Sequence, residues 1–426
     1  MRSRATPLAL AALLMMSGAA IAQLLPPLGG GLGQATGGID QLGNRIGGAV
    51  EETTEQAGGL VDRLARLRLD QLGELVRRNP QALELDARGD PAVKGELIVL
   101  DPTPTMIAAA TAAGFAVIDR GGVEGLGIAM ARLRVPPGML LTKAEKLLAR
   151  LAPSAMVQSN PIYRQSGAPA GGSDHPPATS STGPGATIGL IDGGVAQHPA
   201  LPPTIVQRGF AEGAPAPGNH GTAIASILVG RGALRGVSPQ SRLLAADIYG
   251  RDPRGGNALA IARALGWLTA SGAKVVNISL AGPPNPLLSR VVAAADERGV
   301  LMVAAVGNDG AAAPAAFPAS CPQVIAVTGV DGRGRTLIEA GRAAHLDFAA
   351  PGADLIAANA AGGTIKVRGT SFAAPFVAGR LARLAVAGSL PRTRAIALLT
   401  AETTQPKGGS ARLYGRGVVC ASCTTH

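Results

Sequence analysis

Short apolar runs alternate with helical segments from residue 186 to the end of the chain, and this alternation limits the possible folds more than any other feature. The runs are continuously apolar, as expected for strands buried on both faces of a sheet. We therefore predict an α/β fold with a doubly wound, mostly parallel sheet and helices on both faces. The expected strands are ATIGLI, SRLLAADIY, AKVVNISL, GVLMVAAV and QVIAVTGV, and the expected helices lie in HGTAIASILVG, GGNALAIARALGWLTASG, NPLLSRVVAAADERG, SFAAPFVAGRLARLAVAG and PRTRAIALLTAE.

A second pattern precedes this one, in residues 94–165. GELIVL, FAVIDR, LGIAMARLRV and SAMVQSNPIY are typical of strands, and PTMIAAATAAG and TKAEKLLARLAP are typical of helices. Their order is β-α-β-β-α-β, the split βαβ arrangement, which predicts a small α+β domain. In its second helix we expect Thr142 to be the N-cap and Glu145 to complete a capping box.

The remaining segments have the composition of a leader and a linker. Residues 1–22 contain two early arginines, an apolar stretch and a final Ala-Ile-Ala, the pattern of a secretory signal peptide. The apolar stretch is short for a membrane span, so an uncleaved membrane anchor is only the second alternative. We expect an exported protein, secreted or periplasmic, without a stable membrane span after signal removal. Residues 23–93 predict a Gly-rich leader with one or two helices, or a membrane-surface helix as the alternative. Residues 166–185, rich in Pro, Gly and Ser, predict an exposed linker.

Charge and cysteine content bear on partners and cofactors. The 426 residues carry a net charge of +11, and a basic chain can bind nucleic acid. The chain lacks blocks of Lys and Arg interleaved with aromatic residues, so we expect a solvated basic surface and no nucleic-acid partner. Cys321, Cys420 and Cys423 are too few for a disulfide framework. Cys420 and Cys423 form a CxxC pair near the C-terminus, without the context of a redox or zinc site.

Asp192 and His220 are the first candidate functional residues. Asp192 directly ends the apolar run 188–191 and stands before two glycines. A carboxylate there lies at the edge where α/β sheets bind their ligands, although Asp-Gly is also a simple turn pair. His220 opens an expected helix, where the positive end of the helix dipole favours a neutral imidazole that can act as a base. A purely structural histidine is the alternative.

Ser371 stands at an expected strand-to-helix turn in VRGTSFAAPFVAG. A serine at this place can be an N-cap and nothing more. However, Gly369, Ala373 and Ala374 leave room around its hydroxyl, and the helix start offers free N–H groups to a developing negative charge. Pro375 is a further feature that a simple cap does not need.

These three residues supply the parts of a nucleophilic triad. A serine hydroxyl needs a base to take its proton, and the base needs a carboxylate to orient it and to stabilise its cationic form. The chain offers a carboxylate, an imidazole and a hydroxyl in the order Asp192, His220, Ser371.

The motifs around these residues resemble those of the subtilisin-like serine peptidases. IGLIDGGV, NHGTAIASILVG and GTSFAAPFVAG resemble the three active-site motifs of that family, VVNISLAGP its substrate-binding strand, and AAVGNDG the segment with its oxyanion-hole asparagine; FPASCPQVIAVTGVD and LDFAAPG resemble further landmarks. The resemblance covers about residues 186–420. Residues 94–165 are similar in element order to the propeptide domain of the family.

The resemblance implies a secreted serine endopeptidase that is made as a pre-pro-enzyme, with protein or peptide substrates and its own propeptide as partners. The implied domains are the signal peptide 1–22, the leader 23–93, the propeptide 94–165, the linker 166–185 and the catalytic domain 186–423. Ser371 would attack the peptide bond, His220 would carry the proton, and Asp192 would orient the imidazole. The implied oxyanion-hole residue is Asn308, and the implied substrate-binding residues are Ser279, Leu280, Ala281, Gly282 and Val306.

Two departures from the family pattern predict specificity. Ala281 and Val306 are larger than the residues usual at these places in the family, so we expect a narrow primary pocket and a preference for small residues before the cut bond. No acidic cluster forms a convincing calcium loop, so no metal site and no cofactor are assigned, and calcium stays open.

Other functions remain as alternatives. A catalytically inactive peptidase scaffold that binds at the cell surface would be indicated by loss of a triad residue, and none is lost. A lipase-like acyl hydrolase would carry Gly-x-Ser-x-Gly with the serine first in the chain, whereas this chain has Gly-Thr-Ser-Phe-Ala with the serine last. A third alternative is a protein whose leader binds a membrane or a polyanion.

Overall fold

The computed structural model describes residues 66, 68–169 and 184–424. The predicted signal peptide, most of the leader and most of the linker lie outside the described residues. Residues 68–78 are helical, in agreement with the prediction of one or two helices in residues 23–93. None of the helices in the described ranges is long and apolar enough to cross a membrane.

The first sheet belongs to residues 83–161 and is antiparallel throughout. Its strands run in the order β1-β2-β4-β3, and β5 also pairs with β2. From β2 onward the elements follow the predicted β-α-β-β-α-β order, but β1 and the start of β2 precede the expected boundary at residue 94. The elements are β1 (Leu83–Leu85), β2 (Pro91–Leu100), α3 (Pro104–Ala112), β3 (Ala116–Val123), β4 (Ile128–Arg134), α4 (Leu141–Leu151) and β5 (Met156–Pro161).

The start of α4 differs from the sequence prediction. The N-cap residue is Leu140, whose side chain makes no capping bond. The capping box predicted for Thr142 and Glu145 is therefore wrong. Instead, Glu84 Oε2 accepts a hydrogen bond from the Leu141 backbone N–H at 3.1 Å, across 57 residues of chain. A side chain from β1 thus satisfies a helix-end donor that a local cap would otherwise take.

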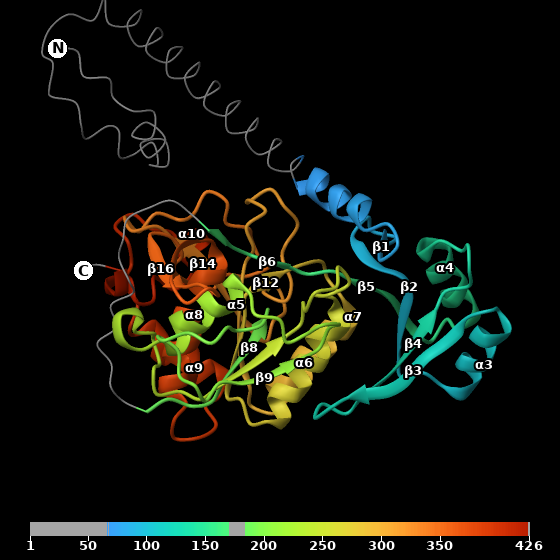
Figure 1. Cartoon of the computed structure of the whole chain (residues 1–426), viewed down its shortest axis with the longest axis horizontal. Helices are drawn as coiled ribbons and strands as arrows, with labels where there is room; N and C mark the ends of the chain where they lie inside the picture. Colours follow the sequence, from blue (N-terminus) through green and yellow to red (C-terminus); the bar gives the residue numbers. More distant parts are fainter. Residues whose placement is uncertain (1–65, 67, 170–183, 425–426) are drawn as a thin grey trace, which may run out of the picture. The chain divides into compact units, whose positions relative to one another are not determined.

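The second sheet contains seven strands, and all of its strand pairs are parallel. Its order is β15-β14-β13-β11-β8-β10-β9, so the predicted doubly wound α/β fold is confirmed. Helices α6 and α7 pack against each other in Figure 1. The elements are β8 (Ile188–Asp192), β9 (Val206–Gly209), α5 (Asn219–Val229), β10 (Leu243–Asp247), α6 (Ala258–Ala270), β11 (Val275–Ile278), α7 (Pro286–Glu297), β13 (Leu301–Ala305), β14 (Val324–Val330), β15 (Phe348–Pro351), α8 (Thr370–Leu384), α9 (Arg392–Thr400) and α10 (Ala411–Tyr414), with short 3₁₀ turns at Gly232–Leu234 and Ala421–Thr424.

Both faces of the larger sheet are buried, because successive side chains of a strand point to opposite faces. Met302 and Ala304 of β13 join a core cluster with residues of α6 and α7. Val303 and Ala305, from the same strand, join a second cluster with residues of α5 and α8. This explains why the strands are continuously apolar in the sequence.

Two small sheets connect residues 162–169 to the larger unit, by which we mean residues 184–424 with the seven-stranded sheet. Strand β6 (Arg164–Gln165) pairs antiparallel with β12 (Leu280–Ala281). Strand β7 (Ala168–Pro169) pairs antiparallel with β17 (Thr364–Arg368), which pairs in turn with β16 (Leu355–Ala358). Ser166, between β6 and β7, is buried. The predicted exposed linker therefore does not begin at residue 166, because strand pairing holds its first residues on the larger unit.

Candidate active site

Asp192 and His220 are joined at the carboxyl edge of the larger sheet. Asp192 is the last residue of β8 and is fully buried. Its carboxylate accepts a hydrogen bond from the Gly193 backbone N–H at 2.7 Å. His220, in the first turn of α5, places Nδ1 2.9 Å from both carboxylate oxygens. The carboxylate therefore fixes the ring orientation and holds a proton on Nδ1, which leaves Nε2 for chemistry.

Ser371 lies in the first turn of α8 and is fully buried. Its hydroxyl donates to the Ser279 carbonyl at 2.9 Å. The Nε2 atom of His220 is buried and makes no hydrogen bond to any residue that the structure describes. The structure thus joins Asp192 to His220, while it turns the Ser371 hydroxyl toward Ser279.

Two donors converge on the backbone carbonyl of Ser166. Asn308 Nδ2 donates to this oxygen at 2.6 Å, and the Ser371 backbone N–H donates to it at 3.0 Å. The side-chain oxygen of Asn308 accepts hydrogen bonds from the backbone N–H and the hydroxyl of Thr370, both at 3.1 Å. These bonds orient the amide, so its N–H group points at the carbonyl. Such a pair of donors can stabilise negative charge on the oxygen.

The predicted substrate-binding strand, β12, pairs with a segment of the same chain, β6. Leu280 lies opposite Gln165, and Ala281 lies opposite Arg164. The Ser279 carbonyl accepts a long hydrogen bond, 3.4 Å, from the Ser166 backbone N–H. An extended segment has therefore been added to a strand edge, the usual way in which a cleft holds a peptide backbone.

Gly282 and Val306 lie beside this strand. An ideal Cβ on Gly282 would lie 2.4 Å from Cδ1 of Tyr163. The Tyr163 ring therefore packs directly against the Gly282 backbone, in the space that a side chain would fill. Val306 is 1% exposed and belongs to the core cluster that contains Met302. It lines, together with Ala281, a cavity of about 300 Å³.

The site also contains residues, such as Gly307, Gln165, Arg164 and Asp309, that are not among the predicted site residues. An ideal Cβ on Gly307 would lie 3.1 Å from the Ala281 methyl and 3.6 Å from the Ala316 methyl, so these two alanines flank it. Gln165 donates to Asp192 Oδ1 at 2.9 Å. Arg164 binds both oxygens of Asp309 at 2.8 Å. Asp309 directly follows Asn308 in the chain, and this position beside a predicted site residue is the one sequence feature that could have indicated it.

The smaller domain also contacts the helices of the larger unit. Asn160 accepts a hydrogen bond from the backbone N–H of Leu259, in the first turn of α6, at 3.0 Å. Gln158 accepts one from the backbone N–H of Leu287, in the first turn of α7, at 3.2 Å. Both side chains satisfy donors that a helix start leaves free.

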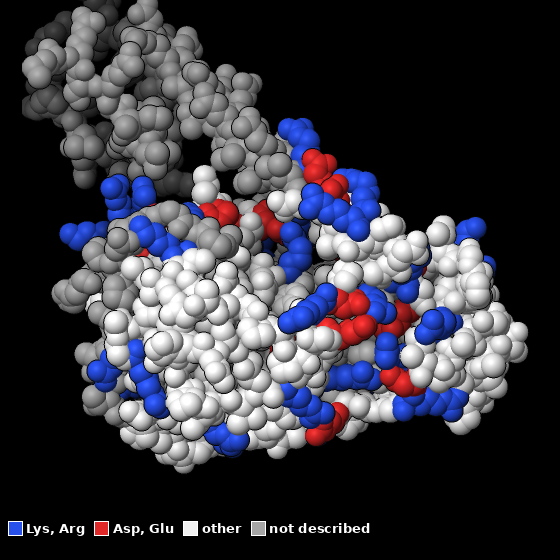
Figure 2. Space-filling view, in the orientation of Figure 1, with Lys and Arg blue, Asp and Glu red and all other residues white. Residues whose placement is uncertain are grey.

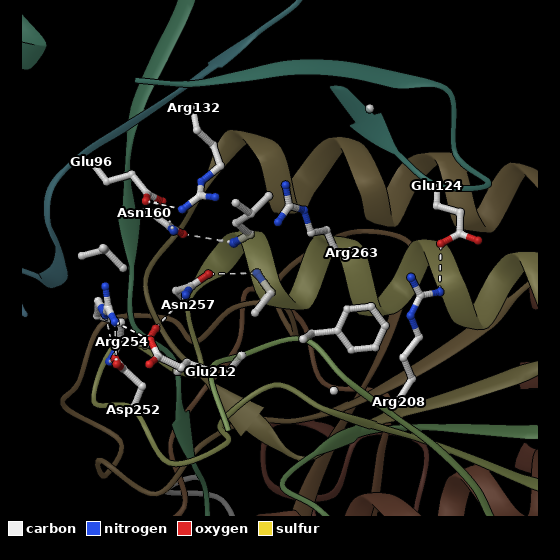
Figure 3. A pocket seen from close by; sticks show the side chains of 18 residues that line it. Glu96, Glu124, Arg132, Asn160, Arg208, Glu212, Asp252, Arg254, Asn257 and Arg263 are labelled. Carbon is white, nitrogen blue, oxygen red and sulfur yellow. Dashed lines mark hydrogen bonds and ion pairs between the residues drawn. The ribbon is translucent and has the colours of Figure 1, made fainter. Parts of the chain in front are cut away.

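Ion pairs surround a cavity of about 630 Å³ that is lined by residues of the smaller domain and by residues of the segment 208–263 (Figure 3). Arg208 binds Glu124 at 3.0 Å, and Arg263 binds Asp119 at 3.1 Å. A hydrogen bond from Arg254 lowers the pKa of Asp252 to about 2. Figure 2 shows acidic and basic side chains mixed in a band across this face. This cavity is therefore lined by charged side chains, and it lies outside the Asp192–His220 site.

The cysteines and acidic residues add no further chemistry to this site. Cys321 is buried and free, and burial raises the pKa of its thiol to about 11. Cys420 is disulfide-bonded. Within the described ranges, no group of three or more His, Cys, Asp or Glu side chains is placed to hold a metal ion.

Comparisons with known proteins identify the family. A sequence model of the Subtilase family matches residues 183–417. Subtilisin BL from Lederbergia lenta is 33% identical over 254 residues, which are 57% of this chain and 92% of that protein. Subtilisin Savinase from the same organism is 32% identical over the same shares. The structure of fervidolysin from Fervidobacterium pennivorans, a keratinolytic enzyme related to subtilisin, is similar in fold, with a TM-score of 0.65 at 20% identity over 80% of this chain and 63% of that one. Since the family match spans more than half of the chain, and the parallel sheet agrees with it, the protein belongs to the subtilase family and is a subtilisin-like serine endopeptidase.

Proposed function

We propose that this protein hydrolyses peptide bonds through Asp192, His220 and Ser371, and that its first substrate is its own Ser166–Gly167 bond. The observation that carries this proposal is the Ser166 carbonyl, which receives hydrogen bonds from Asn308 Nδ2 and the Ser371 backbone N–H. A carbonyl held by two convergent donors beside a serine is placed as a scissile bond would be.

The chemistry follows the roles of the three residues. The Ser371 hydroxyl leaves the Ser279 carbonyl and turns to Nε2 of His220, which has no partner in the described structure. Ser371 Oγ attacks the Ser166 carbonyl carbon while His220 takes the hydroxyl proton. The amine of Gly167 then leaves with that proton, and an acyl-enzyme remains. Water, activated by His220, releases the Ser166 carboxylate and restores Ser371.

Residues before the cut bond act as a propeptide in this proposal. They end in the strand that occupies the cleft, and their domain binds the starts of α6 and α7 through Asn160 and Gln158. The parallel sheet requires pairings between distant segments, which form slowly, so an attached template is useful for folding. We expect residues 167–426, the product of this cut, to yield little active enzyme when they are expressed alone. Refolding as efficient as that of the whole chain would contradict this role.

The decisive test uses the nucleophile. The wild-type precursor should yield a new N-terminus at Gly167, read by terminal sequencing, and a fluorophosphonate probe should label Ser371. The Ser371→Ala precursor should stay intact and unlabelled, whereas Ser389→Ala, a change at an exposed serine, should behave as wild type. Undiminished cleavage by Ser371→Ala would refute the triad, and a different N-terminus would refute the assigned bond.

Two observations support the expected preference for small residues before the cut bond. Ser166 is itself small, and the methyl groups of Ala281 and Ala316 flank Gly307. A peptide library should show small residues before the cut, and Ala281→Gly should admit larger ones. A wild type that prefers phenylalanine would contradict this preference.

Export is also part of the proposal. The signal pattern of residues 1–22 and the exported nature implied by the family resemblance support a secreted or periplasmic enzyme. Recovery of the enzyme from the cytosolic fraction alone would contradict it. The inactive surface-binding scaffold is not favoured, since the chain retains all three triad residues.

A further inference from the structure

We propose that Phe372 restricts the residue after the cut bond to glycine, so that this peptidase cleaves small residue–glycine bonds. The inference rests on the proposed function, because it takes Ser166–Gly167 as the bond that is cut. It adds a specificity-determining residue on the leaving-group side of that bond.

The space at Gly167 is too small for a side chain. An ideal Cβ on this residue would lie 2.4 Å from Cε2 of Phe372 and 3.1 Å from both Cδ2 and Cζ. Real Cβ atoms essentially never come within 3.0 Å of a heavy atom in this way. The φ angle of Gly167 lies outside the left-handed region. Glycine is therefore required here by the space available and not by the backbone conformation.

The Phe372 ring has little freedom to make room. It is 2% exposed and belongs to the core cluster with Ile224 and Phe376. Its centroid lies 5.3 Å from that of the His220 ring. A larger residue at position 167 would therefore push the ring into close-packed core or against the proposed catalytic base.

The bound segment has equally little freedom to retreat. Before Gly167, the Ser166 carbonyl is held by Asn308 and Ser371. After it, Ala168 and Pro169 lie opposite Arg368 and Val367 in a strand pair. Because Gly167 is fixed from both sides, a clash would be relieved chiefly by moving the scissile carbonyl off its two donors. The penalty therefore falls on the reaction itself.

A peptide series tests this restriction. Quenched-fluorescent peptides would carry Ile-Tyr-Arg-Gln-Ser-X-Ala-Pro, with X as Gly, Ala, Ser or Leu. We expect kcat/KM for Gly to exceed that for Ala by about 10- to 200-fold in the wild type, as when a pocket rejects one or two extra carbons. In Phe372→Ala the same ratio should fall to within about threefold. Taking the ratio within each enzyme removes any effect of the substitution on His220.

If Phe372→Ala fails to fold, self-cleavage of the full-length precursor provides a second test. Gly167→Ala should slow self-cleavage at this bond by at least about tenfold. The matched control is Gly121→Ala, where an ideal Cβ meets nothing within 4 Å and φ is also outside the left-handed region. This control should cleave like the wild type.

The outcomes separate the two proposals. Equal cleavage of all four peptides, or normal self-cleavage of Gly167→Ala, overturns the glycine restriction and leaves the peptidase assignment intact. An unchanged Gly/Ala ratio in a folded Phe372→Ala removes Phe372 as its cause. Failure to cut any peptide, together with no labelling of Ser371 by the fluorophosphonate probe, overturns the proposed function itself.

Discussion

Tyr163, three residues before Ser166, is the side chain on which docking in the cleft is expected to depend most. It is fully buried, and its hydroxyl donates to the Pro283 carbonyl at 2.6 Å. Its ring lies on Gly282, where an ideal Cβ would come within 2.4 Å of Cδ1. Burial raises the pKa of Tyr163 well above its usual range. The phenol therefore remains protonated, and remains a donor, at any working pH.

The expected losses follow from this burial. A tyrosine side chain buries about 150–250 Å², which at about 25 cal/mol per Å² corresponds to roughly 4–6 kcal/mol. Alanine retains Cβ, which is worth about 1 kcal/mol of this total, so we expect its peptide to lose at least about 3 kcal/mol, or roughly 100-fold or more in kcat/KM. Phenylalanine retains the ring but leaves the Pro283 carbonyl without this donor. This should cost about 1–2 kcal/mol, or roughly 5- to 30-fold.

The assay compares peptides with Tyr, Phe or Ala at this position, with Ser-Gly kept at the cut bond. Wild type should prefer them in that order. In Gly282→Ala the added methyl takes the place of the ring, so the Tyr and Phe peptides should lose most of their advantage while the Ala peptide changes little. The two substitutions form a double-mutant cycle that isolates the contact. An Ala peptide cleaved within about threefold of the Tyr peptide by wild type, or a full Tyr preference in a folded Gly282→Ala, would refute this reasoning.

Three further predictions concern other groups. Asn308→Ala should lower kcat by about 100- to 1,000-fold with little change in KM, a size known for removal of such a donor in subtilisin; a rise in KM alone would instead make Asn308 a binding residue. Cys321 should resist alkylation at about pH 8 in the folded enzyme and react after unfolding, since burial raises its thiol pKa to about 11; rapid native alkylation would contradict this. The hydrogen bond to Asp347 raises the pKa of His345, so its stabilising effect is present below the unfolded pKa of about 6.5 and is lost as pH rises through the folded value. His345→Gln should therefore lower urea stability, by less than about 1 kcal/mol, near pH 5.5 and have no such effect near pH 9, and the opposite trend would disprove the pairing.

The sequence by itself determined the fold class and the places of the triad candidates. Strands buried on both faces must be continuously apolar, so runs such as 188–191 revealed the parallel sheet directly. Asp192 ends such a strand, while His220 and Ser371 open helices. Strand ends and helix starts leave local marks in the residue pattern. For this reason the three candidate residues could be selected without coordinates.

Only the tertiary structure decided what occupies the cleft and what surrounds it. Ser166 and Gly167 lie in a segment whose composition predicts an exposed linker, yet backbone hydrogen bonds hold them between β12 and β17. Backbone pairing requires no particular side chains, so it leaves no signature in the sequence. The approach of Phe372 to Gly167 likewise joins residues distant in the chain, and it follows from how the segments pack. Local periodicity records which face of an element is buried, but contacts between distant segments exist only once the chain has folded.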